Sequence, residues 1–547
     1  MSNFILKTLE TRELKLNTIK LRGFYGGKLR KGSGDGFPQL PGDVTRWHFG
    51  GLTNEMMAAM DDPRIEDADH KGRFLSFKNF AWKGMSGVGG YGDENYQTFY
   101  KFTLDDYVFI ASPPGVKHMN FTFRVTGLQP GNKLTLAFFG TTNTVYGIWD
   151  KDGIYTVDAD IVEAGKPTYF YNGYGATRGE FTIEILPLYP GALVFDGVDD
   201  YGTCDNFPIL TKEKGYTVVA LRQWISMGEG LYGLVSNVKN WFNDGAFVLE
   251  YNSNNATNKF VNRPVSFGNV NIEMDLPNNF TYQTSKSYKG VPITTGSFKG
   301  TNSLFVGKLN NIIGNCSNVA IWELVFLDHD ATEEELTKIK DYFVKTYPWL
   351  FPDQAWTVVG KTNEDEDRAT IANITGNGND LVLSNFGFIE GSGYNEEGEY
   401  AGYLVTDGVD DSGRAVGLTI SKDFTLVGEW ILFSKTSVNA GLSIHPQIHI
   451  FNRPEVIQII FRTAGKTLPV KSLKAICSDG RCYDENWSEL KINVGEFTDN
   501  KGTLFVASNG TNYAQIAFKN LGIYNDQLLS KDDCIKAYNY LQTLKAK

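Results

Sequence analysis

Between about Tyr96 and Leu188, apolar and polar residues alternate along the chain with a period of two. The alternation recurs in six short segments, among them YQTFYKFTL, NFTFRVTGL and EFTIEILPL. Turn-forming segments such as QPGNK and DKDG separate them, and no helical period intervenes. Because alternation turns one apolar face of each strand toward a core, these residues predict a small antiparallel β-sandwich over residues 95–190.

The residues before this sandwich lack such a period. GFPQLPGDVTRWHFGG and GMSGVGGYG are rich in turn-forming residues, and only the start of NEMMAAMDDPRIEDADH suits a short helix. We expect residues 1–94 to form an irregular attachment region packed on a partner or a neighbouring domain. Basic residues outnumber acidic ones between positions 7 and 31, which suits either an acidic protein surface or a solvated arm.

After residue 190 the chain repeats itself. FDGVDDYG begins at Phe195 and TDGVDDSG begins at Thr406, and four further pairs of segments recur in the same order. The pairs are GYTVVALRQWI with DFTLVGEWILF, FVNRPVSF with IFNRPEVI, NSLFVGKLNN with KGTLFVASNGTN, and NVAIWELVFL with IAFKNLGIYN. The shared order predicts a duplicated domain, with copies at residues 191–350 and 351–547.

Both copies end with the pattern of a short amphipathic helix. TEEELTKIKDYFVKTY and SKDDCIKAYNYLQTL begin with Thr332 and Ser530 as N-caps, followed by acids in the first turn and lysines later. Each copy is therefore expected to be a β-sandwich closed by one helix, with YPWLFPDQ as the linker between the copies. The predicted fold class is all-β and multi-domain.

The composition agrees with this prediction and argues against some classes of function. Aromatic residues make up 14% of the 547 residues, and 58 glycines accompany only 18 prolines, as suits short strands and tight turns. The net charge of −11 argues against a nucleic-acid partner. Apolar stretches fall short of the ~20 residues of a membrane helix, so no membrane insertion is expected. Five unpatterned cysteines and the absence of a secretion signal predict synthesis in a reducing cytoplasm with free thiols.

The repeated Asp-Gly-Val-Asp-Asp segment carries three acids. A glycosidase needs two carboxylates across one sugar ring, but adjacent Asp199 and Asp200 in a strand face opposite sides. We favour a turn in which Asp196 bonds to backbone amides and Gly197 supplies a positive φ. A calcium site formed by Asp196, Asp199 and Asp200 is the alternative, because clustered carboxylates are suitable oxygen ligands. No other cofactor and no catalytic residue is indicated.

Two tryptophans are candidates for ligand contact. Trp241 in NVKNWFNDG and Trp487 in YDENWSEL lie in polar segments, where an indole ring could stack on a sugar. Trp224, Trp322 and Trp430 lie in apolar runs and are expected in the core. GVGGYG matches G-x-G-x-x-G, but it lacks the preceding strand and following helix that phosphate binding requires.

The repeated segments carry a family resemblance. LVFDGVDDYGTCDNFP, YTVVALRQW and the closing NVAIWELVFLDHDATEEELTKIKDY resemble concanavalin A-like or laminin G-like jelly-roll domains, which open with an F-D-G-x-D-D-Y hairpin and close with a strand and a helix. The match covers residues 192–350 well and is weaker in residues 351–547, where Thr406 and Ser412 replace the usual Phe and Tyr. The resemblance implies two jelly-roll sandwiches in tandem.

The segment ALVFDGVDDYGTCDNFPILTKEKGYTVVALR is also similar to laminin G-like proteins of crAss-like and other tailed phages of Bacteroides. This resemblance implies a virion structural protein, a head or tail fibre or another appendage, synthesised in the cytoplasm of the bacterial host. It implies contacts with capsid or tail proteins through residues 1–94 and a homo-oligomer, with a trimer favoured. The sandwiches would act as adhesive modules that bind host or mucosal glycans.

Two alternatives remain open at this point. Jelly-roll folds also include glycoside hydrolases and lyases, although no Glu-rich strand of the form E-x-D-x-E occurs, so we expect no enzymatic activity. The chain could also be a structural spacer without a ligand, because fold alone does not decide function.

Overall fold

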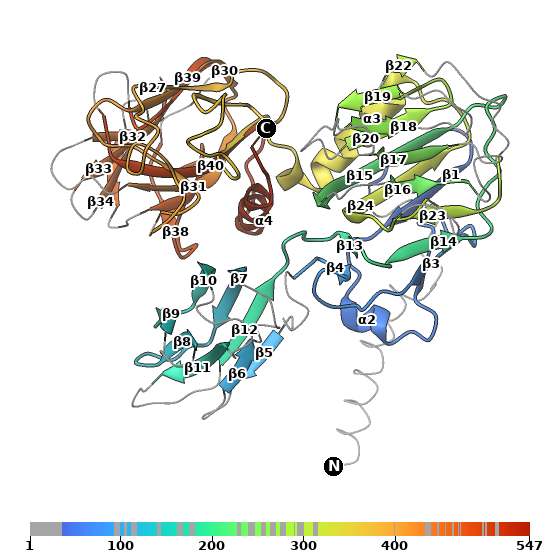
Figure 1. Cartoon of the computed structure of the whole chain (residues 1–547), viewed down its shortest axis with the longest axis horizontal. Coiled ribbons are helices and arrows are strands. Elements are labelled where there is room, and N and C mark those ends of the chain that lie inside the picture. Colours follow the sequence, from blue (N-terminus) through green and yellow to red (C-terminus); the bar gives the residue numbers. More distant parts are fainter. Residues whose placement is uncertain are drawn as a thin grey trace, which may run out of the picture.

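The computed structural model describes residues 36–546, apart from short ranges within them. Those ranges are 92–98, 103–106, 111–117, 139–143, 161–167, 174–180, 227–230, 239–246, 253–258, 263–269, 274–279, 289, 293–299, 310–314, 399, 433–438, 446–447, 454–455, 462–463, 469, 471, 495–496, 498–499 and 509–512. The described strands form six antiparallel sheets, which make three sandwiches (Figure 1). This confirms the predicted all-β, multi-domain fold class. None of the described helices has the length and apolar character needed to cross a membrane.

The first sandwich consists of two eight-stranded sheets. One sheet has the order β22 (Val291–Pro292), β21 (Ser287–Tyr288), β20 (Phe280–Thr284), β15 (Thr217–Ser226), β24 (Asn318–Leu327), β13 (Leu193–Asp196) and β4 (Gly87–Val88), with β1 (Val44–His48) also paired to β24. The other has the order β19 (Val270–Glu273), β18 (Lys259–Asn262), β17 (Val248–Asn252), β16 (Leu231–Ser236), β23 (Leu304–Val306), β14 (Tyr201–Cys204), β3 (Phe74–Lys78) and β2 (Arg64–Glu66). The short helix α2 (Asn54–Ala58) lies between β1 and β2 in the chain.

The second sandwich repeats this plan. Its first sheet has the order β28 (Gly393–Asn395), β29 (Tyr403–Val405), β40 (Ile516–Asn525), β31 (Phe424–Leu432), β36 (Leu473–Cys477), β37 (Arg481–Asp484) and β38 (Glu489–Lys491), with β25 (Gln354–Thr357) also paired to β40. The other has the order β26 (Thr370–Ile371), β27 (Leu381–Ser384), β30 (Ser412–Ile420), β39 (Asn500–Val506), β32 (Asn439–His445), β33 (Ile448–Arg453), β34 (Val456–Phe461) and β35 (Ala464–Leu468).

A smaller sandwich interrupts the first one and is called the inserted sandwich below. One of its four-stranded sheets has the order β10 (Gly153–Asp160), β7 (His118–Thr126), β12 (Phe181–Leu186) and β5 (Phe99–Phe102). The other has the order β6 (Tyr107–Ile110), β11 (Thr168–Gly173), β8 (Lys133–Phe138) and β9 (Thr144–Trp149). Its strands lie in the chain between β4 and β13, two neighbouring strands of the first sandwich.

The division at residue 94 is a point where the structure differs from the sequence-based prediction. Strands β1 to β4 are part of the first sandwich, and each has a counterpart in the second: β25, β26, β27 and β28. Trp47 lies opposite Leu324 just as Trp356 lies opposite Leu521, and both indoles are fully buried. Residues 44–88 are therefore not a separate attachment region. Residues 1–35, which include the basic arm, lie outside the described residues.

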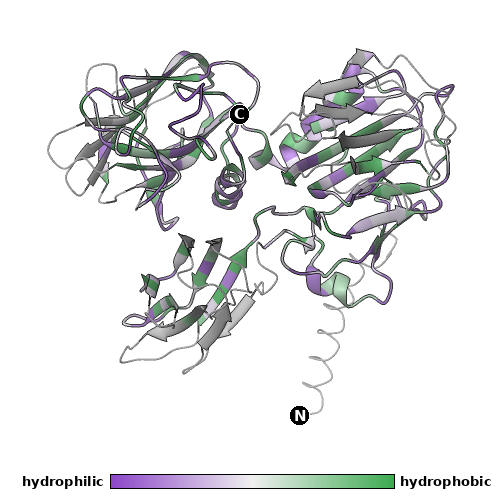
Figure 2. Ribbon diagram, in the orientation of Figure 1, coloured by the Kyte–Doolittle hydropathy of each residue, from purple (hydrophilic) through white to green (hydrophobic). Residues whose placement is uncertain are grey.

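The physical reason lies in the length of these strands. All four have five or fewer residues, and β4 has only two, so each is too short to show an alternating pattern. They are held by pairing with strands distant in sequence, as β1 is held by β24. Figure 2 shows apolar residues concentrated along β15 and β24, in which eight and nine of the ten residues are buried.

The closing helices agree with the sequence pattern. Helix α3 (Glu333–Thr346) begins after Thr332, whose hydroxyl accepts the amide of Glu335 while the Glu335 side chain bonds back to Thr332. Helix α4 (Lys531–Gln542) begins after Ser530, which accepts the amide of Asp533. Each helix covers the outer face of its own sandwich, so a capped amphipathic helix completes each copy.

The segment YPWLFPDQ is not an exposed linker. It contains a short 3₁₀ helix, η1 (Pro348–Leu350), in which Trp349 and Leu350 are buried in a core cluster shared with α3, α4 and the inserted sandwich. The backbone oxygen of Trp349 accepts the hydroxyl of Tyr524 at 2.9 Å, and Lys536 lies over the Trp349 ring. The two helices and η1 therefore join the three sandwiches at one apolar junction.

Candidate functional site

The acids of the repeated pentapeptide form a tight turn between β13 and β14. The Oδ1 atom of Asp196 accepts the amides of Val198 at 2.7 Å and Asp199 at 3.3 Å. Gly197 has a φ of 80°, and a side chain there would lie 2.8 Å from the Cβ of Asn318. The turn predicted from the sequence is therefore present, with Asp196 and Gly197 in the expected positions.

Asp200 fastens this turn to the loop before β4. One carboxylate oxygen accepts the Asp196 amide at 3.1 Å, and the other accepts the Ser86 hydroxyl at 3.0 Å. Ser86 in turn accepts the amide of Ala81 at 2.7 Å. Burial raises the pKa of Asp200 to about 7, the neighbouring charge of Asp196 adds to the rise, and the Ser86 hydrogen bond opposes it.

The second sandwich repeats the turn, but the buried Oδ1 atom of Asp411 has no hydrogen-bond partner among the described residues. Asp407 accepts the amide of Val409 at 2.8 Å, Asp411 accepts the Asp407 amide at 2.9 Å, and Ser392 accepts the amide of Gly387 at 2.9 Å. Burial likewise raises the pKa of Asp411. The sequence does contain a signal for the two serines, which occupy the same position in NFAWKGMSG (79–87) and NFGFIEGSG (385–393). Most of the residues between the shared positions differ, so the repeat is hard to recognise.

The calcium alternative fits these groups poorly. Asp196, Asp199 and Asp200 each place a carboxylate oxygen within 4.8 Å of the others, as do their three counterparts in the second sandwich. However, the turn amides already occupy Oδ1 of Asp196, and both oxygens of Asp200 accept hydrogen bonds. A pKa raised to about 7 also describes a carboxyl group that binds a proton readily, whereas calcium requires ionised oxygens. The carboxylates of Asp196 and Asp200 therefore stabilise the turn.

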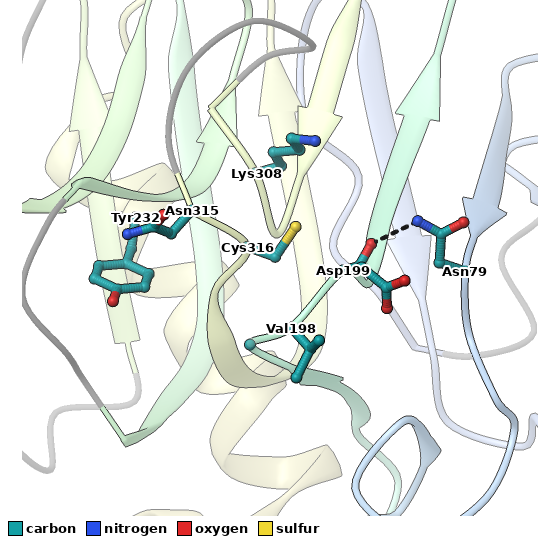
Figure 3. Close-up of a pocket in the computed structure, with 8 residues that line it drawn as sticks. Asn79, Val198, Asp199, Tyr232, Lys308, Asn315 and Cys316 are labelled. Carbon is teal, nitrogen blue, oxygen red and sulfur yellow. Dashed lines mark hydrogen bonds between the residues drawn. The ribbon is translucent and has the colours of Figure 1, made fainter.

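A polar cleft of about 430 Å³ opens beside this turn (Figure 3). Asp199 and Asn79 lie on one side of it, Tyr232 and Asn315 lie on the other, and Lys308 and Cys316 lie between them. The remaining described lining residues are Gly197 and Val198.

Each side of the cleft is held by the sandwich framework. The Asn79 amide donates to the backbone oxygen of Asp199 at 3.0 Å, which joins the end of β3 to the turn. Tyr232 on β16 forms an isolated parallel bridge with Asn315, immediately before β24. The side chains that line the cleft therefore come from four separate segments that only the folded sheets bring together.

The described lining of the cleft contains one ammonium, that of Lys308, and one carboxylate, that of Asp199. The Lys308 ammonium lies 4.8 Å from the centre of the Tyr201 ring, a cation–π distance, and among the described residues no carboxylate lies within ion-pair distance of it. Burial raises the pKa of the Cys316 thiol, and Lys308 only partly offsets the rise. The Cys316 thiol is therefore protonated, and it lines the cleft without acting as a nucleophile.

The described residues of the second sandwich differ from those of the first at two positions that line the cleft. The pairing of β39 with β32 places Ser508 and Tyr513 where β23 and β16 of the first sandwich place Lys308 and Cys316. The ammonium and thiol are thus replaced by a hydroxyl and a phenol. Duplication preserved the turn, but the residues at the rim diverged.

The two tryptophans predicted to contact a ligand have different outcomes. Trp487 is 1% exposed, packs edge-on against Tyr538 of α4 at 5.7 Å between ring centres, and belongs to the junction core. The prediction that Trp487 is exposed for ligand contact is wrong, because helix α4 covers this polar segment. Trp241 lies outside the described residues. Trp224, Trp322 and Trp430 are buried, as predicted.

No protein-family model matches this chain, and no curated protein matches it. Among solved structures, the binding domain of botulinum neurotoxin serotype D is 10% identical, with a TM-score of 0.25, and the alignment covers 62% of this chain and 88% of that one. The binding domain of serotype G has a TM-score of 0.23 at 10% identity, covering 62% and 90%. A Trypanosoma rangeli sialidase in complex with sialic acid has a TM-score of 0.25 at 10% identity, covering 87% and 83%. Likenesses this weak carry no argument about function.

Proposed function

We propose that the chain is an adhesive structural protein whose first sandwich binds a glycan in the cleft between Asp199 and Tyr232. The observation that carries this proposal is the composition of the cleft wall. Two amides, one carboxylate and one ammonium converge on a hollow of about 430 Å³, beside a tyrosine ring. Pockets that orient small polar ligands combine a few such groups in this way.

The chemistry of a sugar suits these groups. Each hydroxyl of a pyranose both donates and accepts, so it pairs with the amides of Asn79 and Asn315, the carboxylate of Asp199 and the ammonium of Lys308. The Tyr232 ring offers an apolar surface to the C–H face of the sugar. An open cleft of this size holds one or two sugar rings weakly, and several copies displayed together would bind a glycan-coated surface through avidity.

Binding is favoured over hydrolysis by the acids of the cleft. A glycosidase needs an acid and a second carboxylate on opposite sides of the bond that it breaks. Among the described residues that line the cleft, Asp199 is the only carboxylate. Asp196 and Asp200 are engaged by the turn, so the glycan-active enzyme remains the second candidate, without an observation that favours it.

The display of this cleft on a tailed-phage virion is the second part of the proposal, and it rests on the sequence resemblance. In that setting, residues 1–94 would contact capsid or tail proteins, and the protein would form a homo-oligomer, with a trimer favoured. The chain would be made in the host cytoplasm and assembled there. Five buried free thiols are compatible with folding in a reducing compartment.

A glycan array with the full chain tests the binding proposal. We expect one class of glycan to be retained, and D199N and K308A to lower retention at least tenfold, since each removes a group that faces the sugar. S508A, at the position equivalent to Lys308 in the second sandwich, is the matched control and should bind normally. Equal binding by all three variants would reject this cleft.

Two further measurements separate the other candidates. A reducing-sugar assay on the retained glycan should detect no turnover, and turnover that D199N abolishes would favour the enzyme. Mass spectrometry of purified particles from an infected Bacteroides culture should find the chain in the virion. Its absence would reject the virion assignment and leave the binding proposal standing.

A further inference from the structure

The chain enters and leaves the inserted sandwich through two segments that lie side by side. The Leu188 amide donates to the backbone oxygen of Gly90 at 2.8 Å, and the Tyr189 amide donates to that of Gly89 at 2.7 Å. Next to them, the Gly89 amide donates to the backbone oxygen of Ala192 at 2.8 Å, and β4 pairs with β13. Hydrogen bonds of the first sandwich therefore close this hairpin at the base of the insertion.

The second sandwich closes the equivalent hairpin without an insertion. Its strands β28 and β29 hold the places of β4 and β13 beside the central strand, and residues 396–402 join them. The Gly402 amide donates to the backbone oxygen of Asn395 at 2.7 Å. Because one copy of the fold is complete with a short connection here, the small sandwich is an addition to a framework that does not require it.

One sheet of the inserted sandwich contributes to two cores. Phe123 of β7 and Tyr155 of β10 belong to the core between its own two sheets. Their neighbours Thr122 and Ile154 point the other way, because side chains alternate along a strand. Nevertheless, Thr122 is only 6% exposed and Ile154 only 4%, and Ile154 belongs to the cluster that contains the residues of α3, α4 and η1. Another part of the chain therefore covers this outer face.

The second sandwich supplies that cover (Figure 1). The Ile154 amide donates to the backbone oxygen of Asn486, in the turn between β37 and β38, at 3.4 Å. Arg124 of β7, which lies opposite Ile154 in the sheet, is 3.8 Å from Asp532 of α4. The inserted sandwich thus contacts both a turn and the closing helix of the second sandwich.

The turn between β37 and β38 is held firmly. The Asp484 carboxylate accepts the amides of Asn486 at 2.9 Å and Ser488 at 2.7 Å. Trp487 has a φ of 61°, which is uncommon for a large side chain, and its buried ring packs on Tyr538 of α4. Such a conformation persists only where the surroundings impose it. The polar segment around Trp487 therefore offers the inserted sandwich a fixed surface.

The first and second sandwiches contact each other directly at η1 and α4. Among the described contacts, the Tyr524 hydroxyl donates to the backbone oxygen of Trp349, and the Gln223 amide donates to the Thr543 hydroxyl at 2.8 Å. Domains joined by a short segment and a limited interface move relative to one another by default. A third body that contacts both of them restricts that movement.

We propose that the inserted sandwich is a brace: the first sandwich folds without it, and its contact with the turn and α4 fixes the orientation of the second sandwich. This inference goes beyond glycan binding and does not rest on it, since none of the described residues that line the cleft belongs to the inserted sandwich.

A replacement variant tests both parts of the proposal. Residues 92–186 are exchanged for Gly-Ser-Gly-Ser, which can span the gap because Gly90 and Leu188 are hydrogen-bonded neighbours. Hydrogen exchange should show that β15 and β24 keep their protection. Spin labels on Glu213→Cys and Glu366→Cys, at exposed positions of the first and second sandwiches, report the orientation, since the native cysteines are buried. Double electron–electron resonance should give a distance distribution at least twofold wider than in the full chain.

A matched pair of substitutions tests the contact with the insertion in place. Ile154→Asp puts a carboxylate into the buried contact, near Asp532, and should also widen the distribution. Ile148→Asp is the control, because Ile148 is 57% exposed on β9 in the other sheet, and it should leave the distribution unchanged.

Three results would overturn the proposal. The first is an unchanged distribution in the replacement variant, and the second is equal widening by Ile148→Asp and Ile154→Asp. The third is loss of protection of β15 and β24 in the replacement variant, which would show that the first sandwich needs the insertion to fold. Ile154→Asp would then still test the orientation in a chain that keeps the insertion. Glycan retention is measured on the same variants and should not change, so failure of the brace and failure of glycan binding are distinguished.

Discussion

The first and second sandwiches each bury one carboxylate at the same point of the same sheet, but on different strands. In the first, Glu323 of β24 lies opposite Leu221 of β15. In the second, Glu429 of β31 lies opposite Asn520 of β40. Both pairs lie immediately beside the register shift between the two central strands. The acid is therefore one member of this facing pair in the first sandwich and the other member in the second.

In each sandwich the cation that pairs with this acid lies on the strand next to it. Arg46 of β1, next to β24, lies 2.6 Å from Glu323, and His48 and Tyr347 also contact that carboxylate. Lys474 of β36, next to β31, lies 3.1 Å from Glu429. The duplicated framework thus tolerates one buried charge beneath the closing helix, provided that the adjacent strand supplies a counter-charge.

The largest expected effect comes from removing that cation in the first sandwich. Arg46→Met leaves Glu323, which is 0% exposed, without its ion pair, and should lower the free energy of unfolding by about 3–5 kcal/mol. Lys474→Met should cost less, since both members of that pair are 13–14% exposed and Tyr403 and Gln542 still donate to Glu429. Hydrogen exchange of β24 and β40 peptides measures the two separately. An equal or larger loss for Lys474→Met would contradict this account.

The pH dependence of the second sandwich follows from Glu429. Lys474 and Lys519 lower its pKa from 4.5 to about 2, against the effect of burial. The depressed pKa means that this stabilisation is complete above pH 4.5 and is lost as the pH falls toward 2, in total about 3 kcal/mol. Denaturant unfolding should therefore show a wild-type advantage over Glu429→Gln at pH 6 that shrinks below pH 4.5. A constant difference across that range would count against a low pKa.

The turn clamp of the first sandwich should respond to pH in the opposite direction. The pKa of Asp200 is raised from 3.8 to about 7, so its stabilisation is complete below pH 3.8 and is lost as the pH rises through 7. Asp200→Asn keeps an acceptor for the Asp196 amide and does not ionise. We expect wild type to lose about 1–3 kcal/mol relative to Asp200→Asn between pH 4 and 8. Thermal unfolding in matched buffers measures it, and parallel curves would refute it.

The smallest effect compares the two turn glycines. Gly197 and Gly408 have φ values of 80° and 77°, so alanine strains both by about 1 kcal/mol. The added Cβ at Gly197 would lie 2.8 Å from Asn318, whereas at Gly408 it would lie 3.2 Å from Gln515. Gly197→Ala should therefore be the more destabilising in differential scanning calorimetry. The reverse order would show that the second turn is the less adaptable of the two.

The sequence predicted the elements whose signal is local. Thr332 and Ser530 were recognisable as N-caps, because the groups that they satisfy lie three residues away. The Asp196 turn was recognisable for the same reason. Alternation over nine residues in β7 and six in β12 identified the inserted sandwich, since a strand of that length shows its period.

The candidate site could be predicted only in part. The turn with Asp196, Asp199 and Asp200 was visible, but Lys308, Tyr232 and Asn79 come from three other segments, and no local spacing relates them. Trp487 shows the converse: its neighbours in the chain are polar, and yet helix α4 covers its ring. The burial of a residue depends on the elements that pack against it, and its neighbours in the sequence do not indicate which elements these are.

The sequence by itself determined the all-β class, the duplication after residue 190, the repeated turns and the two closing helices. These depend on interactions within a few residues or on repetition of the chain. The tertiary structure decided that β1 to β4 complete the first sandwich, that the small sandwich is inserted into it, and that η1 is buried at the junction. It also decided where the cleft lies. Those features depend on pairings between residues more than 100 positions apart, as Arg46 with Glu323, whose free energy is gained only when the sheets are assembled.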